Sequence, residues 1–325
     1  MKIKILEKKE IKEFYKDSDT FERVTKITRK SWIKNKLVPS DYALERTKNY
    51  LLTMEKRFPH LIIFLSFEHD KFIGWIGISK SDKGQLEIDR WHPIIHPDVN
   101  QEEVFSLLIK KCIIYAEQRN FKEISVSFSI DNDNQQILCE DYLTRYKNMN
   151  FEISDERQFM NLNLSVNYQF SIIKSLHLQL LPLTEVNEYN IAECLYKSFK
   201  QSKDRTFQGL SNNEVNSFFK RRIDPLSSIN TSSIVLKDDN EVIGFGLVKD
   251  RGFDVHLDLL CIHPDYRNKG YSKIIMEHII ASLKDQKIAS LTVGVDPLNS
   301  TALLLYKKLG FKKISSIVEL CFLST

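Results

Sequence analysis

The sequence lacks the features that define several common classes of protein. Its five cysteines are far apart and form no Cys-x-x-Cys pair with histidine partners, which argues against a zinc site or a disulfide framework. No apolar run is long enough for a signal peptide at the N-terminus or for a membrane span elsewhere. We therefore expect a soluble, cytoplasmic protein that needs no metal and no membrane.

The sequence also lacks an excess of either charge. Lys and Arg number 47 against 43 Asp and Glu, and the two signs are interspersed along the chain. Proteins that bind nucleic acid or acidic membranes carry concentrated basic charge, so we expect neither partner. The length of 325 residues favours two domains of about 150 residues each.

The two halves of the chain share an order of motifs that indicates a duplicated domain. The matching segments are an Ile-Gly strand at residues 73–74 and 243–244, a His-Pro-Asp turn at 96–98 and 263–265, and an aromatic residue after a late helix at 151 and 311. A repeat of about 165 residues is too long for a solenoid. We predict domains at residues 1–166 and 172–325, joined by the polar stretch 165–171.

Each half reads as a strand, one or two amphipathic helices, a run of strands, and then helix, strand, helix, strand. The early helices are expected at Phe21–Trp32, Asp41–Phe58, Tyr189–Phe199 and Asn213–Ile223. Strands joined by tight turns pair antiparallel, whereas strands separated by a helix pair parallel. The pattern predicts an α/β fold in which each domain has a twisted mixed sheet, mostly antiparallel, flanked by helices.

A basic glycine loop in the second half predicts a site for a pyrophosphate. It follows the apolar run 257–262 and opens onto a helix that begins near Lys273. Free N–H groups and the helix dipole favour an anion there, and Gly270 lets the backbone approach it closely. The residues expected to contact it are Arg267, Asn268, Lys269, Gly270, Tyr271 and Ser272.

Over roughly residues 175–323 the chain resembles the GNAT superfamily of acyl-CoA-dependent N-acyltransferases. The family's loop, Arg/Gln-x-x-Gly-x-Gly/Ala, is matched by Arg267 and Gly270, with Ser272 in the last place. Asn299, Tyr306 and the Leu-Gly-Phe at 309–311 are similar to the family's helix on the acetyl-CoA side. The resemblance implies two tandem GNAT-like domains, of which the second has a splayed cofactor cleft.

The resemblance also implies how the cosubstrate, acetyl-CoA, is bound and used. A strand N–H polarises the thioester carbonyl, a deprotonated amine attacks it, and Tyr306 protonates the departing thiolate. Residues implied to bind the cofactor beyond the loop are Leu260, Cys261, Ile262, Asn299, Ala302 and Tyr306.

The strand before the loop supplies candidates for the base. Asp254, His256 and Asp258 alternate onto one face, and His256 has the most suitable unperturbed pKa, with Asp258 or a water chain as alternatives. A purely structural role is the alternative for three of the predicted site residues. His256 would then be a half-buried strand residue, Tyr306 a core aromatic residue and Asn299 a helix cap.

The first half departs from the pattern at the loop. Aligning the two His-Pro-Asp turns sets Asn100 opposite Arg267 and Glu103 opposite Gly270. Acidic side chains at a helix start repel phosphate, so we expect this half to have lost the pyrophosphate site. Tyr146, the counterpart of Tyr306, is expected to serve packing.

The sequence thus predicts an N-acetyltransferase that moves an acetyl group from acetyl-CoA to a primary amine by direct attack in a ternary complex. The alternative is a non-catalytic sensor that binds CoA, and a third reading is transfer of another acyl or aminoacyl group. The acceptor, a small amine or a peptide, is expected near residues 198–223 and 314–317. A monomer and a homodimer both fit.

Overall fold

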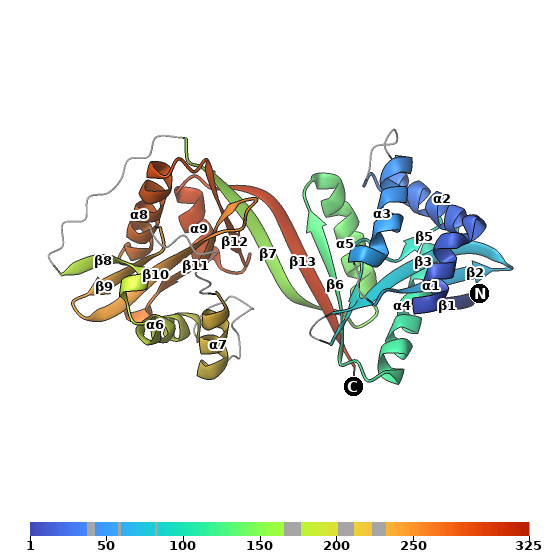
Figure 1. The fold of residues 1–325 in the computed structure, drawn as a ribbon, viewed down its shortest axis with the longest axis horizontal. Coiled ribbons are helices and arrows are strands. Elements are labelled where there is room, and N and C mark those ends of the chain that lie inside the picture. Colours follow the sequence, from blue (N-terminus) through green and yellow to red (C-terminus); the bar gives the residue numbers. More distant parts are fainter. Residues whose placement is uncertain are drawn as a thin grey trace. The chain divides into compact units, whose positions relative to one another are not determined.

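The computed structural model divides the chain into two compact units (Figure 1). Unit 1 consists of Met1–Ser154 and Ser316–Thr325, and unit 2 of Asp155–Ser315. The structure describes residues 1–37, 43–57, 60–81, 84–165, 177–200, 211–222 and 232–324. Part of the predicted joint at 165–171 lies outside these residues.

Unit 1 is a mixed sheet with helices on both faces. Its helices are α1 Lys8–Lys16, α2 Ser18–Lys34, α3 Ala43–Arg57, α4 Gln101–Gln118 and α5 Asp133–Lys147. Its strands are β1 Lys2–Glu7, β2 Ile62–Glu68, β3 Lys71–Lys80, β4 Leu86–Ile88, β5 Ile94–Ile95, β6 Glu123–Ile130 and the end of β13 Lys312–Leu323. The order is β1-β2-β3-β4-β6-β13, and β5 pairs with β3. Only β4 and β6 run parallel among the pairs described in this unit.

Unit 2 repeats this plan. Its helices are α6 Glu188–Lys200, α7 Asn212–Arg222, α8 Tyr271–Asp285 and α9 Ser300–Lys308, with 3₁₀ turns at Leu183–Glu185 and Pro264–Tyr266. Its strands are most of β7 Glu152–Asn163, then β8 Leu178–Pro182, β9 Ile234–Asp238, β10 Glu241–Asp250, β11 Val255–Ile262 and β12 Ser290–Val295. The order is β7-β12-β11-β10-β9-β8, in which the parallel pair is β11 with β12. The predicted fold class and the four early helices are confirmed.

The two units exchange their last strands, so they do not follow the predicted division at residues 166–172. Strand β13, the last in the chain, pairs with β6 of unit 1, whereas β7 pairs with β12 of unit 2 (Figure 1). The strands that end the two repeats, β7 and β13, both alternate apolar and polar residues and both pair antiparallel with their neighbours. This pattern is compatible with pairing in either sheet. The order of motifs in the sequence cannot distinguish the two pairings.

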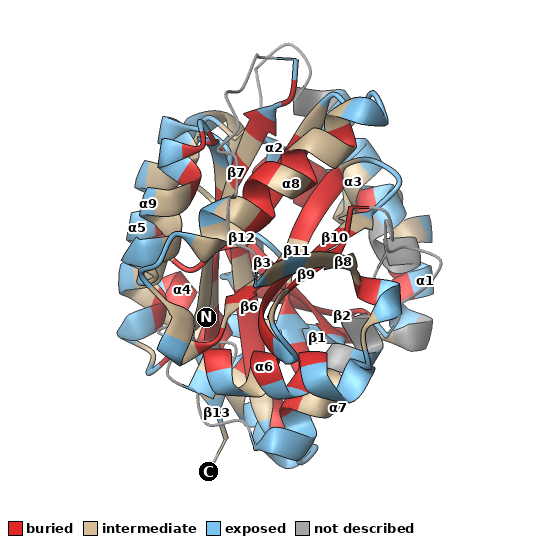
Figure 2. Ribbon diagram, turned by 90° about the vertical axis from the view of Figure 1, so that its left-hand side faces the viewer, coloured by how far each residue is buried: buried red, intermediate tan, exposed pale blue. Residues whose placement is uncertain are grey.

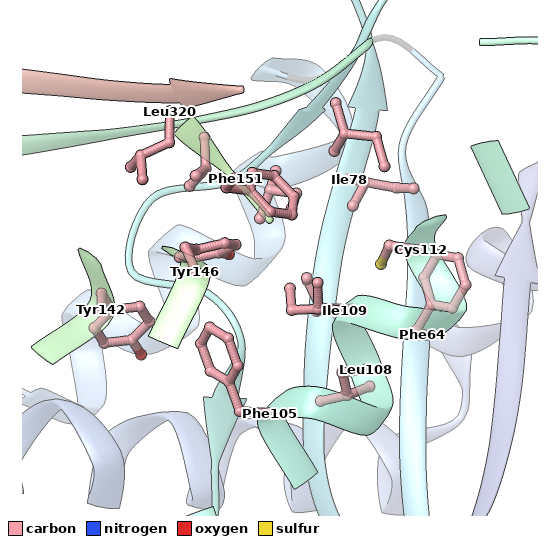
Figure 3. Packing of buried hydrophobic residues seen from close by; sticks show 14 of the residues in the cluster. Phe64, Ile78, Phe105, Leu108, Ile109, Cys112, Tyr142, Tyr146, Phe151 and Leu320 are labelled. Carbon is pink, nitrogen blue, oxygen red and sulfur yellow. The ribbon is translucent and has the colours of Figure 1, made fainter. Parts of the chain in front are cut away.

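Each sheet buries a core on both of its faces. In unit 1, α4 and α5 cover one face, and Phe105 and Tyr146 pack there with Phe151 and with Leu320 from β13 (Figure 3). Helices α1, α2 and α3 cover the other face around Trp75. In unit 2, α8 and α9 lie on one face, and α6 and α7 lie on the other.

Helix α8, which follows the basic loop, is held close against β10. A Cβ added to Gly246 of β10 would lie 2.5 Å from Ile279 Cδ1 and 3.0 Å from Ile275 Cγ2 of the helix, so a larger residue would require these side chains to shift. The buried face of α8 includes Ile275, Ile279 and Leu283, and Figure 2 colours this side red. The start of α8 is therefore fixed relative to the strands beside it.

None of the five cysteines forms a disulfide, and four of them, including Cys261, are buried. Within the described ranges, no helix is both long and apolar enough to span a bilayer.

Candidate active site

The basic loop ends in a left-handed glycine that opens α8. Gly270 is the N-cap of the helix with φ = +85°, and no side chain caps the helix there. A Cβ added to Gly270 would meet no atom within 4 Å, so the glycine is required by its backbone conformation and faces open space. In the described part of the chain, the N–H groups of residues 268–272 donate no hydrogen bond. Unbonded N–H groups at a helix start can donate to an anion.

Arg267 holds this loop in place. Its Nη2 donates to the carbonyl of Ser198 at 2.5 Å, and its Nε donates to that of Ile262 at 3.4 Å. The guanidinium therefore ties the loop to α6 and to the end of β11, and it keeps further N–H donors for an anion. The ammonium of Lys269 lies 4.8 Å from the centre of the Tyr266 ring.

Strands β11 and β12 separate next to the loop. Their parallel pairing joins His256 to Thr292 and Leu257 to Val293, and the register in these fully described strands extends no further. On its other side β11 stays paired with β10 as far as Ile262. The backbone of residues 260–262 thus borders an opening in the sheet, whereas the Cys261 side chain is buried away from it in the core under α6.

A cavity of approximately 390 Å³ lies at this opening. It is lined by the three predicted catalytic residues His256, Asp258 and Tyr306, and by the predicted cofactor contacts Leu260, Asn299 and Ala302. The loop residues 267–272 do not line this cavity. The structure brings one group of predicted residues together in a single cavity and places the other group at the start of α8.

His256 has a defined hydrogen-bond arrangement. The residue is 5% exposed, and its Nδ1 lies 2.8 Å from Thr292 Oγ1. The Thr292 hydroxyl donates its proton to Asp254 or to the carbonyl of Val255, so it accepts from His256. Nδ1 of His256 therefore carries a proton in this arrangement.

Asp258 is buried between two cations. Its carboxylate lies 3.9 Å from Lys249 Nζ and 3.6 Å from Arg251 Nη2, and its side chain is 2% exposed. These ion pairs give Asp258 a clear role in balancing charge at the cavity wall.

Helix α9 supplies Asn299 and Tyr306. Asn299 is the N-cap of the helix, and its Oδ1 accepts from the N–H of Ala302 at 3.2 Å. Its amide nitrogen has no hydrogen-bond partner among the residues that the structure describes. Tyr306 is 5% exposed, packs against Phe311 at 5.4 Å between ring centres, and still lines the cavity.

One wall of the cavity could not be expected from the sequence. Asp155, Arg157 and Phe159 belong to β7, a strand assigned by its position to the first repeat. The carboxylate of Asp155 lies 3.2 Å from Nε of Arg157. Only the strand exchange brings these side chains to unit 2, so no local pattern could have found them. Part of the expected acceptor region, residues 201–210 and 223, lies outside the described residues.

The corresponding helix of unit 1 begins in a different way, which corrects the expected alignment. Its N-cap is Asn100, whose Oδ1 accepts from the N–H of Glu103 at 3.3 Å. Asn100 therefore corresponds to Gly270, and Glu103 lies inside the helix. The connection from the His-Pro-Asp turn to the helix is three residues shorter than in unit 2, as the 3₁₀ turn and the basic loop have no counterpart.

Tyr146, the counterpart of Tyr306, is fully buried in unit 1. Its hydroxyl donates to the carbonyl of His92 at 2.7 Å, and burial raises its pKa well above the ordinary value. Phe105 and Phe151 pack against its ring (Figure 3). These contacts agree with the expected packing role.

Comparisons with known proteins show what the C-terminal part of the chain is similar to. Residues 195–311 match the model of the acetyltransferase (GNAT) family. The uncharacterized N-acetyltransferase ycf52 of Pyropia yezoensis is 35% identical over 89 residues, which are 27% of this chain and 49% of that protein. The peptidyl-lysine N-acetyltransferase YjaB of Salmonella typhimurium is 34% identical over 79 residues, or 24% and 48% of the two chains. The chain spans about half the length of these curated relatives.

A solved structure matches the fold over most of the chain. The GCN5-related N-acetyltransferase of Sphaerobacter thermophilus superposes with a TM-score of 0.55, covering 93% of this chain and 91% of the other at 10% sequence identity. At that identity the likeness concerns the fold alone.

Proposed function

We propose that unit 2 transfers an acetyl group from acetyl-CoA to a primary amine, because residues 195–311 match the acetyltransferase (GNAT) family model. The observation that carries the proposal is the combination of a glycine-capped helix start with unbonded amides and a cavity holding His256 and Tyr306. The N–H groups of residues 268–272 bind the pyrophosphate, aided by Arg267 and Lys269. The edge of β11 at residues 260–262 pairs with the pantetheine arm.

The proposed chemistry needs a base and an acid on either side of the thioester. Nε2 of His256 takes a proton from the ammonium of the acceptor, and the amine nitrogen attacks the carbonyl carbon. A backbone N–H of β11 stabilises the oxyanion, the C–S bond breaks, and the Tyr306 hydroxyl gives its proton to the sulfur. The attacking nitrogen loses its extra proton as it becomes the amide, and this proton restores the Tyr306 hydroxyl. Asn299 donates its free amide N–H to the cofactor arm.

The acceptor is proposed to be a primary amine on a polar molecule or peptide. The relative from Salmonella is named for peptidyl-lysine, which carries such an amine. The cavity wall formed by Asp155, Arg157 and Arg251 offers both signs of charge to the rest of the acceptor.

A panel of amines, with acetyl-CoA as donor and CoA release as readout, tests the proposal. We expect turnover with at least one amine, lost in His256→Asn and retained in part in Asp258→Asn. If CoA binds but no amine or peptide releases it above the rate of hydrolysis, unit 2 is a CoA sensor and the proposed transfer is wrong.

A further inference from the structure

Unit 1 contains a cavity of approximately 650 Å³ at the place that corresponds to the active-site cavity of unit 2. The equivalence follows from the sheet register. The last parallel pair is Ile88 with Val126 in unit 1 and Leu257 with Val293 in unit 2. An aspartate follows next in each, Asp89 and Asp258, and both line their cavities.

Aromatic side chains form one part of the unit 1 cavity. They are Trp32 of α2, Tyr50 of α3 and Trp91, which follows β4. The rings of Trp32 and Tyr50 are 4.9 Å apart between centres. The indole Nε1 of Trp32 is shielded from solvent and has no hydrogen-bond partner in the described ranges. Aromatic faces of this kind attract cations.

Carboxylates form the other part. Glu87, Asp89 and Glu319 line the cavity together with one guanidinium, that of Arg90, so three negative charges face one positive charge. Glu319 of β13 pairs with Ser127, the position that Phe159 of β7 occupies opposite Gly294 in unit 2. At this register position the unit 1 cavity therefore has an acidic side chain where the unit 2 cavity has an aromatic one.

A chain of hydrogen bonds fixes the aromatic and acidic parts relative to each other. The N–H of Gly77 donates to Nδ1 of His92, so Nε2 of His92 carries the proton and donates to Tyr50 Oη at 2.8 Å. The Tyr50 hydroxyl in turn donates to Asp89. Burial lowers the pKa of His92 to about 4, which keeps this ring neutral near neutral pH.

We propose that the unit 1 cavity binds a small organic cation, an ammonium held by the carboxylates against the aromatic faces. The ordering of Tyr50 and Asp89 before binding reduces the entropy lost on binding. Since unit 1 has no basic glycine loop, this site takes its ligand without acetyl-CoA. It is a second binding site, separate from the proposed transfer site.

Choline and its uncharged isostere 3,3-dimethylbutan-1-ol test the proposal on the full chain. Of the three tryptophans, Trp32 and Trp91 line the cavity, and Trp75 is fully buried with its Nε1 bonded to Thr28. We expect choline or butylammonium to change the tryptophan emission in a saturable way, with a matching calorimetric isotherm, and the isostere to have no such effect. Equal responses to choline and the isostere, or no saturable response to either cation, would overturn the proposal.

Variants locate the site. Glu87→Gln and Glu319→Gln are expected to weaken cation binding about tenfold each, because each removes one carboxylate from the cavity. Glu117→Gln, an exposed change on α4, serves as the control and should bind as the parent does. Unchanged affinity in both cavity variants would contradict the proposal, and circular dichroism verifies that each variant is folded.

The second site is distinguished from the transfer site by Gly270→Glu. That change is expected to remove acetyl-CoA binding and to leave choline binding intact. Loss of choline binding in Gly270→Glu, with the fold retained, would assign the cation to unit 2 and overturn the proposal.

Discussion

The two units share one fold and differ most at the start of one helix. In unit 2, Gly270 opens α8 with no side-chain cap, and the neighbouring amides remain unbonded. In unit 1, the side chain of Asn100 caps α4, and Glu102 and Glu103 fill its first turn. The amide of Glu103, which a phosphate oxygen would bind, already has a partner. The two helix starts thus differ by a shorter loop and one capping side chain, and the anion site proposed for unit 2 has no counterpart in the helix start of unit 1.

The cavities of the two units diverge less than the helix starts. Both lie where two parallel strands separate, and both keep an aspartate after the last paired residue. What changes is the side chain at each register position: Glu87 in place of His256, and Glu319 in place of Phe159. A cavity is therefore present at the same place in both sheets, although the side chains that line it differ.

The largest expected effect concerns the exchanged strands. Leu162 on β7 is 1% exposed in the core of unit 2, and Leu320 on β13 is fully buried in unit 1. Placing a carboxylate at either position should cost the unit concerned more than about 4 kcal/mol. Leu162→Asp is expected to abolish acetyl-CoA binding, and Leu320→Asp to preserve it, as measured by calorimetry. The opposite result would mean that each repeat keeps its own last strand.

The next largest effect is at Gly270. A glutamate there is strained at positive φ and presents a negative charge to the phosphates, so Gly270→Glu should weaken acetyl-CoA binding by about two to three orders of magnitude. Gly84→Glu is the matched control, since Gly84 also has positive φ (+75°) and open space around it but belongs to unit 1. If the two variants bind acetyl-CoA equally well, the glycine-capped helix start does not hold the cofactor.

His92 is expected to give unit 1 a pH-dependent stability of about 3 kcal/mol. Burial depresses the pKa of His92 to about 4, below the value of about 6.5 in the unfolded chain. The unfolded state therefore binds the proton more readily, so this contribution to stability is complete above about pH 6.5 and is lost as the pH falls toward about 4. Urea unfolding of unit 1 measured across this range should show the decline, and His92→Gln should flatten it. A decline of equal size in His92→Gln would assign the acid sensitivity to other groups.

The smallest effect separates the two tyrosines. Tyr306→Phe is expected to lower kcat about ten- to a hundredfold with little change in the KM for acetyl-CoA, because it removes the proton donor alone. Tyr146→Phe leaves the His92 carbonyl without its partner and should cost unit 1 about 1–3 kcal/mol, with kcat unchanged. Equal kcat in Tyr306→Phe and the parent would reduce Tyr306 to a packing residue as well.

Much of the fold could be predicted from the sequence, because its signals are local. Periodicity placed α2 and α6, and the His-Pro-Asp turns revealed the repeat. The position of Gly270 at a helix start also followed from local chemistry, since its neighbours change from strand to helix periodicity. The predicted roles of Tyr306 and His256 stay predictions.

What the sequence could not predict depends on pairing between distant segments. Arg157 reaches the cavity of unit 2 only because β7 joins the sheet of this unit, and nothing near Arg157 in the chain signals this. The alignment of Glu103 with Gly270 was wrong because the loop that follows the His-Pro-Asp turn is shorter in unit 1. The turn motif itself, which both units share, does not reveal this difference in length. The link from His92 through Tyr50 to Asp89 likewise joins three segments that no spacing rule connects.

The place of β13 in unit 1 has a consequence for how this chain matures on the ribosome. Translation delivers the first 154 residues early, yet the strand that finishes their sheet emerges after all of unit 2. Strand β7, by contrast, is already available when unit 2 is made. Unit 1 is therefore synthesised first but completes its sheet last. If the gene were divided near its midpoint, the N-terminal fragment would carry β7, which belongs to the sheet of unit 2, and the C-terminal fragment would carry β13, which belongs to the sheet of unit 1.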